Sequence, residues 1–175
     1  MSVLPDLLAP GLDIVFCGTA VGTAVALRGA YYAGPGNAFW PTLFKVGFTP
    51  RLFSPEEYRD LRQYGLGLTD LAKTVWGADN SLSAHHFDRA RLRRTVLKYR
   101  PHVLAFTSKR AAREFVGHPV GYGALREKIG GTALFVLPSP SGAARGHWSV
   151  APWRELARLR SPISGKIPPS TQHRR

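Results

Sequence analysis

A carboxylate and a glycine-rich stretch are the two features of this sequence most capable of chemistry. Asp70 follows the short apolar segment Leu66–Thr69, and a carboxylate can orient a water molecule and stabilise a positively charged reaction centre. Glycines recur between Gly18 and Gly36, and backbone N–H groups of such a loop can stabilise developing negative charge. The alternative for Asp70 is a cap or turn residue, because Thr69-Asp70 precedes Leu71.

Short apolar runs predict the strands that would position these residues. The run Asp13–Gly18 indicates a buried parallel strand, and Val103–Thr107 and Thr132–Leu137 indicate two more. Leu66–Leu71 is expected to be a short extended or turn segment. A loop is expected from Thr19 to about Gly36, and a loop of that length in a compact domain is usually functional.

Helices are expected between these strands. The clearest start is Ser54-Pro55-Glu56-Glu57, a capping box with proline at the first helical position. The expected helices are Asn37–Val46, Ser54 to about Tyr64, Ser83–Tyr99, about Lys109–Phe115 and Ser149–Leu159. This alternation predicts an α/β layered domain with a largely parallel sheet, over residues 1–160. Residues 161–175 are basic and rich in proline and serine, which predicts a disordered tail.

Ligand sites in such sheets lie at the carboxyl ends of the strands. Here the loops after Gly18, Thr107 and Leu137 leave those ends. We therefore expect these three loops to form the functional site.

The charge predicts a polyanionic partner. Lys and Arg number 24 against 11 Asp and Glu, a formal net charge of +13, and such proteins gain affinity for phosphate backbones by releasing counterions. The alternative is a merely basic soluble protein. A role at a membrane is less favoured, because no run of about 18 apolar residues and no long basic amphipathic helix is evident. The N-terminus does not resemble a signal peptide.

Several classes of site are excluded by the sequence. The single cysteine, Cys17, rules out an internal disulfide and an intrachain iron–sulfur cluster. No Cys and His set has zinc spacing, so we expect neither metal nor cofactor. The P-loop and dinucleotide-binding patterns are also absent. A reducing cytoplasm suits such a chain, and we expect a cytoplasmic, nucleoid-associated protein.

Three motifs in order resemble those of the mismatch-specific uracil-DNA glycosylase family, which includes thymine-DNA glycosylase. They are Val15–Gly22, Gly34–Trp40 (with the Pro-x-Asn-x-Phe-Trp pattern) and Val136–Arg145. Further matches occur at Leu7–Gly11 and Gly47–Thr49, so the resemblance covers roughly residues 7 to 160. It implies a three-layer domain with a central four-stranded, mostly parallel sheet flanked by helices. It also implies hydrolysis of the N-glycosidic bond of a base flipped out of DNA, uracil above all.

The first motif departs from the family at a catalytic position. Where the family has an asparagine that positions the attacking water, this chain has Ala20, and the proline that follows is replaced by Val21. Either the enzyme is inactive or the water is held from elsewhere. Asp70 aligns with a family segment that borders the active site, and it is the predicted replacement.

The resemblance also implies residues for the base pocket. Gly18, Thr19 and Ala20 would form its floor. Tyr32 aligns with the aromatic residue that stacks on the base, a role that passes to Tyr31 under a one-residue slip. Two polar side chains complete the predicted base-binding set. Asn37 could bind the uracil edge, cap the next helix, or do both. Ser139 could reach a carbonyl oxygen of the base.

DNA contacts are expected from small residues and cations, which suit a phosphate backbone. Arg145 could enter the gap left by the flipped base, or contact a phosphate. The loop lacks the bulky wedge found in many relatives. The predicted DNA-binding residues are Gly22, Thr23, Lys109, Ser141, Gly142, Ala143 and Arg145. The arginines at 89–94 are expected mainly on a solvated helix face.

Several functions compete at this stage. The leading one is a monomeric, monofunctional glycosylase that takes uracil-containing DNA and leaves an abasic site. Lys73 would have to supply the amine of a bifunctional lyase. A second enzyme hypothesis changes the base to hypoxanthine, xanthine or thymine. The non-enzymatic alternative is a protein that binds abasic or damaged DNA, which Ala20 favours; a structural protein of the nucleoid is more distant. An Asp70 that faces the pocket beside Ala20 would favour catalysis.

Overall fold

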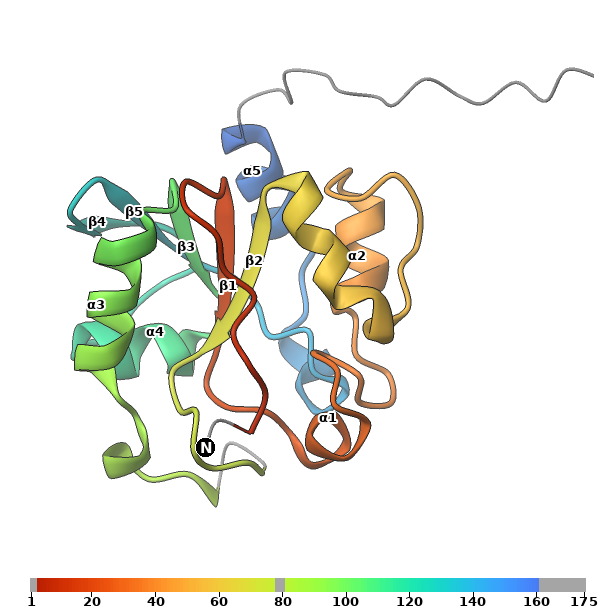
Figure 1. Cartoon of the computed structure of the whole chain (residues 1–175), viewed down its shortest axis with the longest axis horizontal. Helices are drawn as coiled ribbons and strands as arrows, with labels where there is room; N and C mark the ends of the chain where they lie inside the picture. Colours follow the sequence, from red (N-terminus) through yellow and green to blue (C-terminus); the bar gives the residue numbers. More distant parts are fainter. Residues whose placement is uncertain (1–2, 78–80, 161–175) are drawn as a thin grey trace, which may run out of the picture.

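A five-stranded sheet forms the centre of the computed structural model, which describes residues 3–77 and 81–160 (Figure 1). The strand order is β2-β1-β3-β5-β4, and β4 alone among these strands runs antiparallel to its neighbour. The strands are β1 (Ile14–Gly18), β2 (Leu66–Asp70), β3 (Val103–Phe106), β4 (Gly123–Ile129) and β5 (Thr132–Val136). The expected tail, 161–175, lies outside the described residues.

Side chains along each strand alternate between the two faces of the sheet, and both faces are buried. In β1, Ile14 and Phe16 enter one hydrophobic cluster, whereas Val15 and Cys17 enter the other. The continuous apolar runs in the sequence thus reflect strands that are covered on both sides.

Helices supply the two covering layers (Figure 1). On one face lie α3 (Arg89–Tyr99) and α4 (Lys109–Val116), whose apolar residues join the cluster of Val15. On the other lie α2 (Phe39–Lys45), the 3₁₀ segment η1 (Pro55–Tyr64) and α5 (Ala151–Leu159). Shorter elements are α1 (Thr23–Arg28), η3 (Ala84–His86) and η4 (Gly142–His147). The predicted three-layer α/β fold is confirmed.

The structure corrects three details of the prediction. A fifth strand, β4, was missed because its charged middle residues are exposed at the sheet edge and give no apolar pattern. The expected loop after β1 contains α1, which Gly29 ends in the left-handed conformation. The helix expected from Ser83 is divided, and α3 begins only where the Asp88 side chain accepts a hydrogen bond from the Arg91 backbone N–H.

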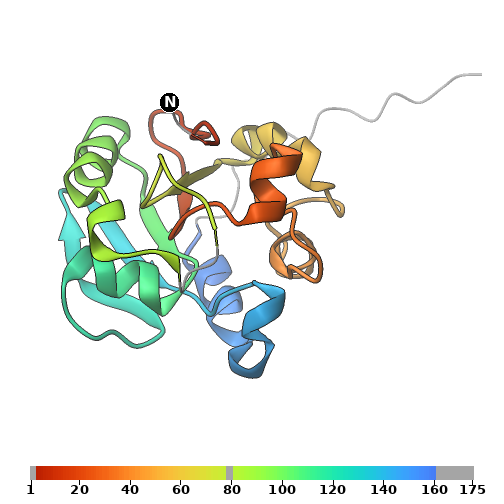
Figure 2. The ribbon, with the colours of Figure 1, turned by 90° about the horizontal axis from the view of Figure 1, so that it is seen from below.

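The N-terminal segment lies along the outer edge of β2. Leu7 forms an antiparallel bridge with Leu68, and the Val3 N–H donates to the carbonyl oxygen of Lys73 at 2.9 Å. The strands' carboxyl ends point toward α1 and α4 at the bottom of Figure 1, and Figure 2 views the molecule from that end. Within the described ranges, no helix has the length and apolar character needed to cross a membrane.

Candidate active site

A cavity of about 730 Å³ lies at the carboxyl ends of the strands. Its lining comes from the loop after β1, the ends of β2 and β3, and the loop after β5. Twelve of the predicted site residues line it: Gly18, Thr19, Ala20, Gly22, Thr23, Tyr32, Asn37, Asp70, Ser139, Ser141, Gly142 and Ala143. Predicted residues that lie more than a hundred positions apart in the sequence therefore line one cavity.

Asp70 is the carboxylate of this cavity. It is the last residue of β2, it is paired in register with Gly18 of β1, and only 4% of it is exposed. Its Oδ1 would lie 2.8 Å from a Cβ added to Gly18, so the carboxylate fills the space a side chain there would occupy. Its Oδ2 is buried and has no hydrogen-bond partner among the described residues. Asp70 is therefore a strand-end residue, which argues against the cap or turn alternative.

Burial changes the acidity of Asp70. The pKa of this carboxyl is raised to about 6: loss of solvation is the main cause and the nearby Asp6 adds to it, while Lys73 and Arg91 oppose the rise. The pKa still lies below neutrality, so about nine-tenths of the carboxyls are ionised at pH 7. A buried carboxylate with this pKa can accept a proton from water at physiological pH.

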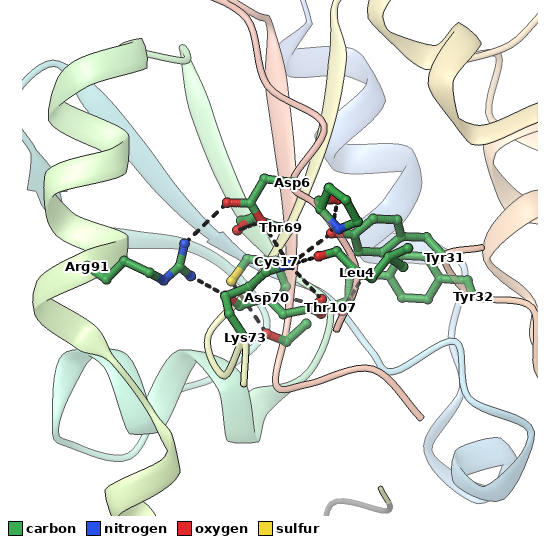
Figure 3. Close-up of polar contacts among 12 residues, drawn as sticks. Leu4, Asp6, Cys17, Tyr31, Tyr32, Thr69, Asp70, Lys73, Arg91 and Thr107 are labelled. Carbon is green, nitrogen blue, oxygen red and sulfur yellow. Dashed lines mark hydrogen bonds and ion pairs between the residues drawn. The ribbon is translucent and has the colours of Figure 1, made fainter. Parts of the chain in front are cut away.

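Lys73 contacts Asp70 from behind the cavity and does not line it (Figure 3). Its Nζ lies 3.6 Å from Asp70 Oδ2 and 2.9 Å from Asp6 Oδ1. It also donates to the Leu4 carbonyl oxygen at 2.6 Å and to the Tyr31 hydroxyl at 3.1 Å. An amine engaged in this way is poorly placed to attack a sugar.

The position of Tyr32 is fixed by three features. Its φ is 53°, a left-handed conformation that bulky residues rarely adopt. Its ring stacks on Phe39 with a centroid separation of 3.9 Å, and its hydroxyl shares a 3.1 Å hydrogen bond with Thr107 Oγ1. Burial raises the pKa of its phenol well above the ordinary value, so the hydroxyl stays protonated. Tyr31 also lines the cavity, but its hydroxyl donates to the Pro5 carbonyl oxygen.

Asn37 and Ser139 each use one acceptor within the protein. The Asn37 Oδ1 accepts the backbone N–H of Phe39 at 2.9 Å, which supports the start of α2. The Ser139 Oγ accepts the backbone N–H of Ser141 at 3.3 Å. Both side chains line the cavity, and each retains a donor for a ligand: the Asn37 amide nitrogen and the Ser139 hydroxyl proton.

Two of the predicted DNA-binding residues do not line the cavity. Lys109 is exposed, and its Nζ lies 4.3 Å from the centre of the Tyr122 ring. Arg145 is exposed in η4, and its guanidinium lies so close to Gly36 that an added Cβ would meet Nη2 at 2.6 Å. Their roles toward DNA stay predictions.

Three residues at or next to the site were not predicted from the sequence. Thr107, which follows β3, lines the cavity and contacts Tyr32; its place at a strand's carboxyl end was the available signal. Asp6 lies in the N-terminal segment, and no local pattern marks it. Arg91 belongs to the arginine run, yet it turns inward to Asp6 and the Asp70 carbonyl oxygen, whereas Arg93 and Arg94 are exposed.

Over the described parts of the chain, no group of three or more His, Cys, Asp or Glu side chains could hold a metal ion.

Comparisons with known proteins agree with this arrangement. The family model described as the Uracil DNA glycosylase superfamily matches residues 5–158. A solution NMR structure from Methanosarcina acetivorans, provisionally described as a uracil DNA glycosylase, superposes with a TM-score of 0.58. It is 21% identical in sequence, and the match covers 89% of this chain and 93% of the other. At this identity the structural likeness supports the fold alone.

Proposed function

The chain belongs to the uracil DNA glycosylase superfamily, and from this premise we propose that it hydrolyses the N-glycosidic bond of uracil flipped out of DNA, leaving an abasic site. The observation that carries the proposal is the buried Asp70 carboxylate, which lines the same cavity as Ala20. Ala20 has no polar group to hold a water molecule, and Asp70 supplies one from the neighbouring strand.

The proposed reaction uses Asp70 as the group that orients water. The water oxygen forms a bond to C1′ of the deoxyribose while the bond between C1′ and N1 of uracil breaks. The electron pair of that bond leaves with the base, and the Asp70 carboxylate accepts the proton of the water. The negative charge of Asp70 also favours the positively charged sugar of the transition state, and an ionised carboxylate is available above pH 6.

The remaining lining residues suit a planar base. Backbone N–H groups of Gly18–Gly22 are candidates to stabilise the negative charge that develops on the base. The aromatic ring of Tyr32 is held rigidly by Phe39, and it offers a stacking surface to the base. The free donors on Asn37 and Ser139 suit the carbonyl oxygens of uracil.

The geometry favours a monofunctional enzyme over the two alternatives. A lyase requires an amine nucleophile in the cavity, and Lys73 lies behind Asp70 with its donors already engaged. A binder without catalysis has no need to bury an ionisable carboxylate, because burial raises the free energy of its charged form. Hypoxanthine, xanthine and thymine remain the alternative bases, since the cavity chemistry does not distinguish among oxygen-bearing edges.

The test is release of uracil from labelled oligonucleotides, one single-stranded and one a G·U duplex. Wild type and Asp70→Asn are compared, with DNA binding measured in parallel. Loss of release in the variant with binding retained supports the proposal. If the wild type releases no uracil, duplexes with hypoxanthine, xanthine and thymine decide between another base and a protein that only binds.

Three narrower assignments belong to the same proposal. We place the chain in the mismatch-specific branch, on the strength of the motifs Val15–Gly22, Gly34–Trp40 and Val136–Arg145. We also propose that it acts as a monomer and that it works on DNA in the cytoplasm, associated with the nucleoid. A G·U duplex cleaved faster than single-stranded uracil DNA would support the branch assignment.

A further inference from the structure

A network of partly buried charges stands behind the proposed catalytic carboxylate (Figure 3). Lys73 follows Asp70 by three residues, and its side chain is only 10% exposed. The Nζ is held by the Leu4 carbonyl oxygen, the Tyr31 hydroxyl and the Asp6 carboxylate. These contacts fix the ammonium group 3.6 Å from Asp70 Oδ2, while Oδ1 lies on the side of Gly18 and the cavity.

Asp6 ties this ammonium to the sheet. Its Oδ1 also accepts the Thr69 hydroxyl at 2.7 Å, and its Oδ2 accepts Arg91 Nη1 at 3.2 Å. Arg91 in turn donates to the backbone carbonyl oxygen of Asp70. The N-terminal segment, β2 and α3 therefore meet at one carboxylate, and the positions of Lys73 and Asp70 depend on it.

The charges that face Asp70 act in opposite directions. Lys73 and Arg91 stabilise its ionised form, whereas Asp6 disfavours it. Three neutral ionisable groups also face Asp70, and burial raises the pKa of each: the Cys17 thiol of β1 and the phenols of Tyr31 and Tyr32. Among the described residues that line the cavity or contact Asp70, Lys73 is the one whose positive charge directly approaches the Asp70 carboxylate.

We propose that Lys73 is a positioning residue for Asp70: held by Asp6, Leu4 and Tyr31, its ammonium group keeps the carboxylate ionised and directs Oδ1 into the cavity. The proposal rests on the proposed function, because it assigns Lys73 to the group that orients the water. It gives the N-terminal segment a role in the reaction, although none of the residues described there, from Val3 onward, lines the cavity.

The first test measures the Asp70 carboxyl directly and does not require activity. The pKa of Asp70 is read from the ¹³C shift of its carboxyl carbon in wild type, Lys73→Met, Lys73→Arg and Asp6→Asn. Loss of a cation within about 4 Å is expected to raise the pKa by about one pH unit or more in Lys73→Met. Lys73→Arg is expected to stay near wild type. Asp6→Asn is expected to lower the pKa, because it removes a negative charge.

The second test is the dependence of base release on pH. In Lys73→Met the acidic limb of the profile is expected to move upward with the pKa of Asp70. The rate at pH 7 is then about 2- to 10-fold below wild type and recovers near pH 9, because a rise of about one to two pH units leaves fewer carboxylates ionised at pH 7. A merely structural loss would lower the rate at every pH.

The outcomes separate this proposal from the proposed function. If the wild type releases no base, the proposed glycosylase activity is refuted, but the carboxyl titration still decides the role of Lys73. An unchanged or lowered pKa of Asp70 in Lys73→Met overturns the proposal. If Lys73→Met does not fold, the other two variants decide the matter: a lowered pKa of Asp70 in Asp6→Asn and an unchanged one in Lys73→Arg support the proposal, and a raised pKa in Lys73→Arg overturns it.

Discussion

Asp70→Asn is expected to make the protein more stable at neutral pH while it abolishes base release. Asp70 is 4% exposed, and its Oδ2 has no hydrogen-bond partner in the described part of the chain. Asparagine has nearly the shape of aspartate, and its amide resembles the protonated carboxyl in charge. The substitution therefore removes the cost of holding a carboxylate in this place.

The magnitude follows from the acidity of Asp70. Folding raises its pKa from an ordinary 3.8 to about 6, a difference of about 2.2, and each pKa unit corresponds to about 1.4 kcal/mol. The ionised side chain thus costs roughly 3 kcal/mol of folding free energy at pH 7. For a chain of this length we expect Asp70→Asn to melt roughly 6 to 12 °C above wild type.

The sign of this effect has a definite dependence on pH. Because the folded pKa is raised, the protonated side chain is the favoured form, and wild type loses stability relative to the variant as pH rises from about 4 through 6. Urea denaturation followed by tryptophan fluorescence, at pH 4, 5, 6 and 7, measures the difference between the two proteins. A variant that is less stable than wild type at pH 7, or a difference that does not vary with pH, would refute the reasoning.

Two further predictions concern the cavity and its rim. Gly18→Ala is expected to reduce base release about 10- to 100-fold with little change in DNA affinity, because the new Cβ displaces the Asp70 carboxylate. Single-turnover rates measure the loss. The control is Gly121→Ala, where an added Cβ meets nothing within 4 Å, and it should behave as wild type. Arg145→Ala is expected to weaken binding to abasic-site duplex and to lower the slope of affinity against salt by about one, as measured by fluorescence anisotropy at several salt concentrations; equal weakening by Arg94→Ala, on the opposite layer, would mean that η4 has no special contact with DNA.

Much of the architecture could be predicted because it depends on local pattern. Continuous apolar runs marked β1, β3 and β5, and the capping box at Ser54 marked the start of η1. Each signal lies within a few neighbouring residues. The edge strand β4 gave no such signal, because four of its seven residues are exposed and three of these are charged. It forms only because β5 offers it a partner for backbone hydrogen bonds.

The composition of the site was also within reach of the sequence. Its residues follow the carboxyl ends of parallel strands, where the backbone of an α/β fold always places ligand sites. The aspartate at the end of β2 and the small residue at position 20 could be connected through family motifs. Whether Asp70 would face the cavity or the solvent could not be known, because Leu66–Leu71 was compatible with either a turn or a strand.

What the sequence by itself determined was the set of helices and strands, the basic charge, and the loops of small residues that line the cavity. What only the tertiary structure decided was the environment of Asp70: Lys73 beside it, Asp6 of the N-terminal segment paired with that lysine, and Arg91 turned inward from an otherwise solvated helix face. The physical reason is that these contacts are electrostatic, and those of Asp6 and Arg91 join residues far apart in the sequence. They leave no periodic pattern along the chain, and they exist only once the N-terminal segment is packed against the edge of β2.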